Sequence, residues 1–263
     1  MTEVSDVANS KFDTDGHSSK TSPYIIATQP RSGSHFLAAL LRDTKQAGVP
    51  LEYFHKRHWQ SWKDRVGADD REALEHLFRL RTSPNGQFGV KMHWHQFTVA
   101  LKLDLESFFH DAKFVYMSRT DLLAQAVSHA IAQQTGVWHS GQKAVGKATF
   151  SMEAIDNSIQ FLLQERSRWE RFFAVTGVQP FRILYEDLLR DTDGEMRRLC
   201  TFLDVQWSGV DHILGGVQRT NLNSEWIEQF RLAKNGAADE NVWKAINKIG
   251  VKPVVSDASA KDG

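Results

Sequence analysis

Four short apolar runs, each followed by a polar cluster, constrain the fold of this chain more than any other feature. The runs cover residues 24–28, 87–92, 113–118 and 181–185. Patterns typical of helices lie between and after them, at 34–44, 69–81, 95–109, 121–134, 151–175 and 191–203. Strands that alternate with helices form a parallel sheet with right-handed crossovers. The sequence therefore predicts an α/β fold, a single domain with a central parallel sheet flanked by helices.

The polar clusters lie where the expected strands end, at 28–34, 91–95, 118–121 and 185–187. Ligands of open parallel sheets bind at the carboxyl ends of the strands. The four clusters are therefore expected to meet in a single composite site.

Composition limits the partners of the chain. Its 263 residues fit one domain, and 32 basic residues balance 32 acidic ones. Without a global basic field, nucleic acid and anionic membranes are not expected partners, so any anion site must be local. The sequence has neither a signal peptide nor an apolar run long enough to span a membrane, which favours a cytoplasmic location. Cys200 is the only cysteine, and its apolar neighbours predict a buried thiol on a helix.

The two ends of the chain are polar. Residues 1–22 are rich in Ser, Asp, Thr and Lys, and we expect them to be a disordered tail. The same expectation holds for 251–263, as a flexible C-terminal tail. The folded domain is then expected to span residues 23–250.

The loop after the first expected strand has the features of an anion site. Gly33 permits a tight turn and a close backbone approach to a ligand. The helix that begins near Ser34 directs its first amide groups and its dipole at the turn, while Ser32 and Arg31 add donors and a positive charge. The structural alternative is an ordinary strand–helix turn with a Ser N-cap.

The loop lacks the G-x-x-x-x-G-K-[ST] pattern of nucleotide-binding P-loops. It resembles the T-Y-P-K-S-G-T loop of cytosolic sulfotransferases, with Arg31 in place of Lys. The form Q-x-R-S-G-S is more similar to the bacterial trehalose 2-sulfotransferase family. This resemblance implies a P-loop-like sulfotransferase fold and transfer of a sulfuryl group from 3'-phosphoadenosine-5'-phosphosulfate (PAPS) without a metal. It assigns donor binding to Gln29, Arg31, Ser32, Gly33, Ser34 and His35.

Further motifs resemble the same family in the same order. The stretch FVYMSRTDLLAQAVS at 114–128 is similar to its V-S-R-x-D-x-x-x-Q-A-x-S pattern, which implies that Arg119 and Ser128 bind the 3'-phosphate of the donor. The local alternative is a salt bridge between Arg119 and Asp121. YEDLL at 185–189 resembles R-Y-E-D-L and implies that Tyr185 helps to orient the donor; core packing of Tyr185 and a helix cap from Asp187 are the alternative.

A late segment, QRTNLNSEWIEQFR at 218–231, resembles a basic family segment that comes near the donor. It makes Arg219 a donor-binding candidate. Trp226 in the same segment is expected to pack instead.

Sulfuryl transfer to a hydroxyl needs a general base, and two candidates exist. Glu52 in GVPLEYFH resembles the proposed base of the trehalose family, and its apolar neighbours are expected to raise the pKa of its carboxyl. His93 follows Lys91 in a K-x-H frame similar to that of the cytosolic enzymes. We rank Glu52 first and His93 second, with Lys91 and Arg31 stabilising the transferred group. His93 and His95 lack a third ligand nearby, so no metal site is expected.

Aromatic stretches supply the acceptor candidates. Gln134 and Trp138 resemble a Q-T-x-x-W stretch of the family, and 53–62 carries two Trp and two His. An indole face packs well on a sugar ring. Substrate-binding residues expected on these grounds are His55, Trp59, Trp94, Gln134 and Trp138. The stretch 53–62 could equally form a contact in a homodimer, which the resemblance allows, or be ordinary surface aromatics.

The sequence thus favours a PAPS-dependent sulfotransferase that acts on a hydroxyl of a sugar or glycolipid. A small polar secondary metabolite could also be the acceptor. A P-loop-like kinase, which the missing G-K-[ST] disfavours, and a non-catalytic binding protein would also suit this fold. The sequence does not identify the acceptor, because acceptor pockets are built from variable loops.

Overall fold

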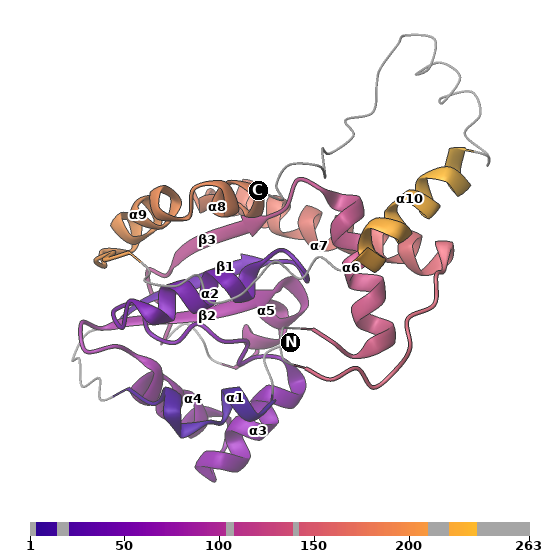
Figure 1. The fold of residues 1–263 in the computed structure, drawn as a ribbon. Helices are drawn as coiled ribbons and strands as arrows, with labels where there is room; N and C mark the ends of the chain where they lie inside the picture. Colours follow the sequence, from indigo (N-terminus) through magenta and orange to yellow (C-terminus); the bar gives the residue numbers. More distant parts are fainter. Residues whose placement is uncertain (1–3, 15–20, 104–107, 139–141, 210–220, 236–263) are drawn as a thin grey trace. The chain divides into compact units, whose positions relative to one another are not determined.

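The computed structural model describes residues 4–14, 21–103, 108–138, 142–209 and 221–235 (Figure 1). The chain divides into two compact units, Met1–Gln218 and Arg219–Gly263. In the second unit the described part is a helix, α10 (Asn221–Asn235), on which Trp226 is buried. Arg219 and the expected tail 251–263 lie outside the described residues.

The first unit contains a four-stranded parallel sheet in the order β2-β1-β3-β4. The predicted α/β class and its central parallel sheet are confirmed. In the register, Thr28 at the end of β1 pairs with His93 on β2, and Ala27 pairs with Tyr116 on β3. The carboxyl ends of the three strands therefore meet around the loop that follows β1. The strands are β1 (Ser22–Thr28), β2 (Gln87–His93), β3 (Lys113–Ser118) and β4 (Phe181–Leu184).

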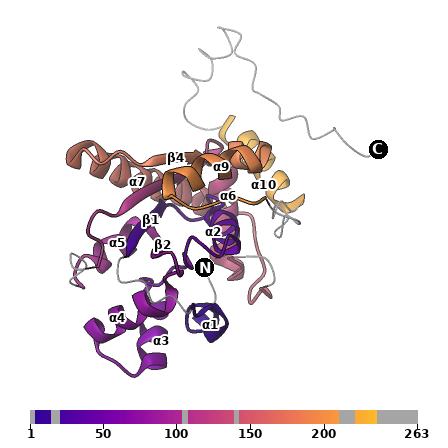
Figure 2. The same cartoon turned by 90° about the vertical axis from the view of Figure 1, so that its left-hand side faces the viewer.

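Helices cover both faces of the sheet, because alternate strand residues point to opposite faces and both sets are apolar. Tyr24 and Ile26 face one hydrophobic cluster, and Ile25 and Ala27 face the other. Figures 1 and 2 show α8 and α9 on one side of the sheet and α3 and α4 on the opposite side. The first cluster includes α2 (Ser34–Asp43), α8 (Tyr185–Arg190) and α9 (Thr192–Leu203), and the second includes α3 (Lys56–Val66), α4 (Asp70–Arg81), α5 (Trp94–Ala100) and α7 (Met152–Thr176). Helix α6 (Leu122–Thr135) packs along α7.

The predicted helices match the structure to within a residue or two, except for one, and α3 is a helix that was not predicted. The expected helix 95–109 ends at Ala100, and 104–107 lie outside the described residues. Helix α3 was not predicted, because basic residues and aromatics mix in its sequence KRHWQSWKDRV. It folds because Trp59 and Trp62 bury one of its sides against the core.

Part of the stretch that was expected to be a tail, residues 4–14, is described by the structure. Residues 4–14 include α1 (Val4–Val7) and a short 3₁₀ turn, Ser10–Phe12. The fully buried Arg81 donates hydrogen bonds to the carbonyl of Val7 at 2.8 Å and to the carboxylate of Asp13 at 2.7 Å. A buried guanidinium requires such partners, and this long-range need orders a segment whose composition alone favours disorder.

Two further features that the sequence analysis addressed are the environment of Cys200 and the presence of membrane-spanning helices. Cys200 is buried on α9, and burial raises the pKa of its thiol to about 11. Among the described residues, no helix has the length and apolar character needed to cross a membrane.

Candidate active site

The loop between β1 and α2 has the backbone geometry of an anion cradle. Gly33 caps α2 with a φ of 86°, and a Cβ placed on it would lie 2.2 Å from the Tyr185 ring, so only glycine fits. Arg31 also has a positive φ, 61°, which is strained for a residue with a side chain. Strain of this kind concentrates at ligand sites. The first intrahelical bonds run from Phe36 and Leu37 to the Gly33 carbonyl, so the amide groups before them point into the loop.

Three hydrogen bonds of buried side chains fix the conformation of this loop. They are Thr28 Oγ1 to Ser32 Oγ at 2.5 Å, Gln29 Nε2 to Tyr116 Oη at 3.1 Å, and Gln125 Nε2 to the Pro30 carbonyl at 2.7 Å. Gln29 and Ser32 are therefore engaged in shaping the loop, a supporting role that the motif alone does not reveal.

Arg31 links three segments of the site. Its Nε donates to Ser128 Oγ on α6 at 2.9 Å, and its guanidinium also donates to the backbone carbonyl of Trp138. Burial lowers the pKa of Arg31 to about 10, and the nearby charge of Arg119 adds to this effect. Two guanidinium groups that repel each other at one edge of the sheet favour an anionic ligand between them.

Arg119 lies at the end of β3, with its guanidinium 5.1 Å from the centre of the Tyr185 ring. It forms an ion pair with Glu186, Nε to Oε1 at 3.6 Å, and Asp121 instead caps α6 by accepting a hydrogen bond from the Ala124 amide. The sequence patterns did not identify Glu186 as a site residue, although it follows Tyr185 in the YEDLL motif.

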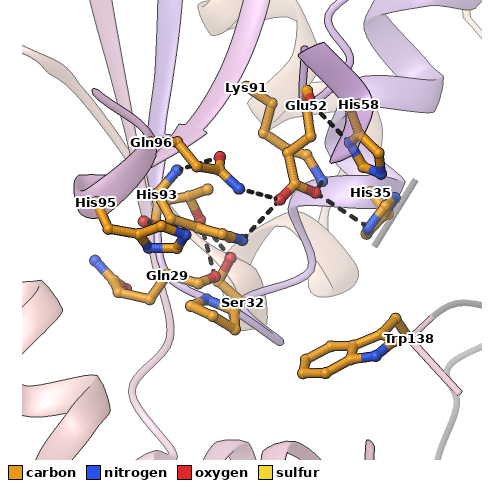
Figure 3. Close-up of polar contacts among 12 residues, drawn as sticks. Gln29, Ser32, His35, Glu52, His58, Lys91, His93, His95, Gln96 and Trp138 are labelled. Atoms are coloured by element: carbon orange, nitrogen blue, oxygen red, sulfur yellow. Dashed lines mark hydrogen bonds and ion pairs between the residues drawn. The ribbon is translucent and has the colours of Figure 1, made fainter. Parts of the chain in front are cut away.

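A buried carboxylate, Glu52, is the centre of the second part of the site (Figure 3). Residues 51–52 run beside β2, because Leu51 forms an isolated parallel bridge with Val90 and its carbonyl accepts the Lys91 amide hydrogen bond. This contact brings the side chains of β2 to Glu52. The distances to its carboxylate are 2.8 Å from Lys91 Nζ, 2.8 Å from Gln96 Nε2, 3.2 Å from His93 Nε2 and 3.9 Å from His35 Nε2.

The predicted rise in the pKa of Glu52 is wrong. Burial by itself raises this pKa, but the charges of Lys91, His93 and His35 and the hydrogen bond from His93 outweigh it, and the pKa lies well below its usual range. Glu52 is therefore an ionised carboxylate at neutral pH. Apolar sequence neighbours indicated its burial but not the cations that surround it.

His93 is held in one orientation. Its Nε2 faces Glu52, its Nδ1 lies 3.4 Å from the Thr28 carbonyl, and 8% of its surface is exposed. Its ring centre is 5.9 Å from that of His95. Among the described residues, no three His, Cys, Asp or Glu side chains form a group that could hold a metal ion.

Two of the expected acceptor residues, Trp59 and Trp94, pack in or against the hydrophobic core. The Trp59 indole is 8% exposed, packs beside Phe54 and donates to Asp70 Oδ1 at 2.9 Å. Trp94 is partly buried against Trp169, with their ring centres 5.1 Å apart. Both indoles thus contact the second hydrophobic cluster, and their role in acceptor binding stays a prediction.

The remaining acceptor candidates, Trp138, Gln134 and His55, have contacts with different segments. The backbone carbonyl of Trp138 accepts a hydrogen bond from Arg31. The Trp138 ring packs edge-on against the ring of buried His129, with 5.8 Å between the ring centres. Gln134 accepts a hydrogen bond from the Thr149 amide at 2.7 Å, which ties the end of α6 to the segment before α7. The ring of His55 lies 4.7 Å from that of His58, and burial, followed by the charge of His58, lowers the pKa of His55 to about 4.

The sequence patterns did not identify two further residues that support the site. Gln96 lies three positions after His93, accepts the His93 amide hydrogen bond at 3.0 Å and contacts Glu52; this capping-box spacing was a readable signal. Glu165, fully buried on α7, accepts the Trp94 amide hydrogen bond at 2.9 Å, and its distance along the chain left no signal.

Comparison with known proteins identifies the family of this chain. The family model of the Stf0 sulphotransferases matches residues 23–233. The trehalose 2-sulfotransferase of Mycobacterium tuberculosis (strain ATCC 35801 / TMC 107 / Erdman) is 25% identical over 80% of this chain and 94% of its own. That of Mycolicibacterium smegmatis is 23% identical over 79% and 94%. A solved sulfotransferase domain from the Synechococcus PCC 7002 olefin synthase covers 91% of this chain and 99% of its own, at 15% identity and a TM-score of 0.44. The chain belongs to the Stf0 sulphotransferase family.

Proposed function

We propose that this sulfotransferase moves a sulfuryl group from PAPS to a hydroxyl of a sugar or glycolipid. The observation that carries the proposal is the hydrogen-bonded loop 28–35, in which Arg31 has a positive φ and a pKa lowered first by burial and then by the charge of nearby Arg119. This pair of cations suits a donor with a phosphosulfate at one end and a phosphate at the other. The names of the two mycobacterial relatives support a sugar as acceptor.

In the proposed reaction the acceptor oxygen attacks sulfur in line. A new oxygen–sulfur bond forms as the bond from sulfur to the 5'-phosphate oxygen breaks, and adenosine 3',5'-bisphosphate (PAP) leaves. The loop amides and Arg31 hold the phosphosulfate, while Arg119 and Ser128 hold the 3'-phosphate. Lys91 stabilises the charge that develops on the transferred group, because preorganised cations act most strongly where water is excluded.

The acceptor proton is assigned to the pair of Glu52 and His93. Glu52 remains the first candidate from its family motif, but its carboxylate is 1% exposed and already has donors from Lys91, Gln96, His93 and His35 around it. His93 Nε2 lies 3.2 Å from the Glu52 carboxylate, so the two groups can share the proton that leaves the acceptor. The two groups thus act as a unit, and a base of this kind contributes about 10²–10⁴ in rate.

Ligand binding tests the donor assignment. In titration calorimetry PAP should bind, and Arg31→Ala or Arg119→Ala should weaken binding more than tenfold, about 1.4 kcal/mol. Heat with ATP but none with PAP would rule out the proposed donor.

Labelled PAPS, with trehalose and a panel of sugars and glycolipids, tests the chemistry. Glu52→Gln should leave PAP binding intact and cut turnover. If turnover survives in Glu52→Gln while His93→Ala abolishes it, His93 is the base and our ranking is reversed.

A further inference from the structure

Glu186 is a carboxylate that the proposed reaction does not use. It is the second residue of α8 and follows Tyr185 at the end of β4. Its carboxylate accepts hydrogen bonds from the amides of Thr120 at 3.1 Å and Asp121 at 3.3 Å, and lies 3.6 Å from Arg119 Nε. Both amide donors and Arg119 belong to the turn between β3 and α6, so the Glu186 side chain contacts three consecutive residues of this turn.

The protonation state of Glu186 fits this role. Burial raises the pKa of its carboxyl, but the backbone hydrogen bonds from Thr120 and Asp121 outweigh burial and lower it. The carboxylate is therefore ionised at neutral pH, and it occupies amide groups at the start of α6 that a ligand phosphate would otherwise meet. An anion that reaches this turn meets the Arg119 side chain instead of those amides.

Two contacts restrain the guanidinium of Arg119. Its Nε lies 3.6 Å from Glu186 Oε1, and its Cζ lies over the Tyr185 ring, 5.1 Å from the ring centre. Tyr185 in turn touches the donor loop, because a Cβ on Gly33 would lie 2.2 Å from its Cδ2 atom. Two consecutive residues, Tyr185 and Glu186, thus set how Arg119 stands relative to the loop after β1.

We propose that Glu186 is a positioning residue that acts through Arg119 and sets the preference for a nucleotide with a 3'-phosphate. This inference rests on the proposed function, in which Arg119 binds that phosphate. Without Glu186 the guanidinium loses a charged restraint, and its charge-assisted hydrogen bonds to the phosphate weaken.

The test measures a ratio: the dissociation constant for adenosine 5'-monophosphate divided by that for PAP, from titration calorimetry. Glu186→Ala should lower this ratio about tenfold, as expected for a weakened charge-assisted contact. Glu186→Gln keeps an oxygen for the turn amides but loses the charge, so its ratio should fall less. Asp187→Ala is the matched control, since Asp187 pairs with exposed Arg190 at 2.7 Å on the same helix; its ratio should not change.

A double-mutant cycle separates positioning from a general structural effect. In an Arg119→Ala background, Glu186→Ala should produce no further change in the ratio. An unchanged or increased ratio in Glu186→Ala, or an equal fall in both backgrounds, overturns the inference. If Glu186→Ala fails to fold, Glu186→Gln decides by the same ratio.

Failure of the proposed function has a different signature. It appears as an unaltered protein that binds no PAP, or that binds both nucleotides equally. An unaltered protein that discriminates, together with a Glu186→Ala variant that does so equally well, refutes only the role of Glu186.

Discussion

Replacing Lys91 by Met should destabilise the protein strongly, because it leaves the Glu52 carboxylate buried without its main cation. Both side chains are 1% exposed, and Lys91 Nζ lies 2.8 Å from Glu52 Oε2. At this distance the attraction is about 6 kcal/mol with an effective dielectric constant of roughly 20. Gln96, His93 and His35 remain around the carboxylate, so we expect the free energy of unfolding to fall by about 3 kcal/mol, the lower end for a broken buried pair.

The loss should depend on pH in a defined direction. In the unaltered protein the pKa of Glu52 is held below its ordinary value, so its contribution to stability is present above that value and is lost as pH falls through the folded pKa. Without Lys91, burial dominates and raises this pKa, so protonation of Glu52 then favours the folded state. The difference between the two proteins should therefore shrink from about pH 7 to about pH 5.

Urea unfolding followed by circular dichroism at both pH values measures this difference. The double variant Lys91→Met with Glu52→Gln should recover part of the lost stability, because no buried charge is left without a partner. A loss below about 1 kcal/mol near neutral pH, or a loss that grows as pH falls, would refute the interpretation of this cluster.

Three other perturbations test parts of the structure. Gly33→Ala places a side chain at a positive φ and against the Tyr185 ring, so it should weaken PAP binding more than tenfold by calorimetry. The control Gly67→Ala is also at a positive φ, but its Cβ would have nothing within 4 Å, so PAP binding should not change. Equal effects of the two substitutions would contradict the role given to Gly33 in the loop. Asp13→Ala leaves buried Arg81 without its carboxylate partner and should lower the free energy of unfolding by about 2 kcal/mol. The control Asp6→Ala removes a more exposed ion pair with Lys11 and should lower the free energy of unfolding by less than about 0.5 kcal/mol. Cys200 should resist a thiol reagent near neutral pH until urea unfolds the protein, because burial raises the pKa of its thiol to about 11; rapid labelling of the native state would show that the thiol is accessible.

Local sequence patterns sufficed for the sheet and for the loop after β1. The strands β1, β2 and β3 are short runs that are buried on both faces, so each run marks its strand without knowledge of its neighbours, whereas β4 at the edge of the sheet has an exposed residue, Arg182. Gly33 and Arg31 stood out for a similar reason, since a tight turn and an anion site each require particular residue types. Candidate binding residues in such local motifs can therefore be proposed before the fold is known.

The acid–base character of the site was decided only by the tertiary structure. The apolar neighbours of Glu52 predict burial, and burial alone predicts a raised pKa. The bridge from Leu51 to Val90 brings Lys91 and His93 to the carboxylate and reverses the direction of the shift. A pKa depends on every charge within a few ångströms, and most of those charges are distant in sequence.

Packing decided the fate of the aromatic residues and of the polar N-terminal segment. Trp59 and Trp94 are residues of a type that packs on sugar rings, and both indoles lie in or against the hydrophobic core. Residues 4–14 have the composition of a tail, yet buried Arg81 needs their carbonyls and Asp13. The sequence by itself determined the strands, the anion loop and the family motifs, because these depend on near neighbours along the chain. The tertiary structure decided which side chains are buried together and with what charge, because burial and Coulomb energy depend on distance in space.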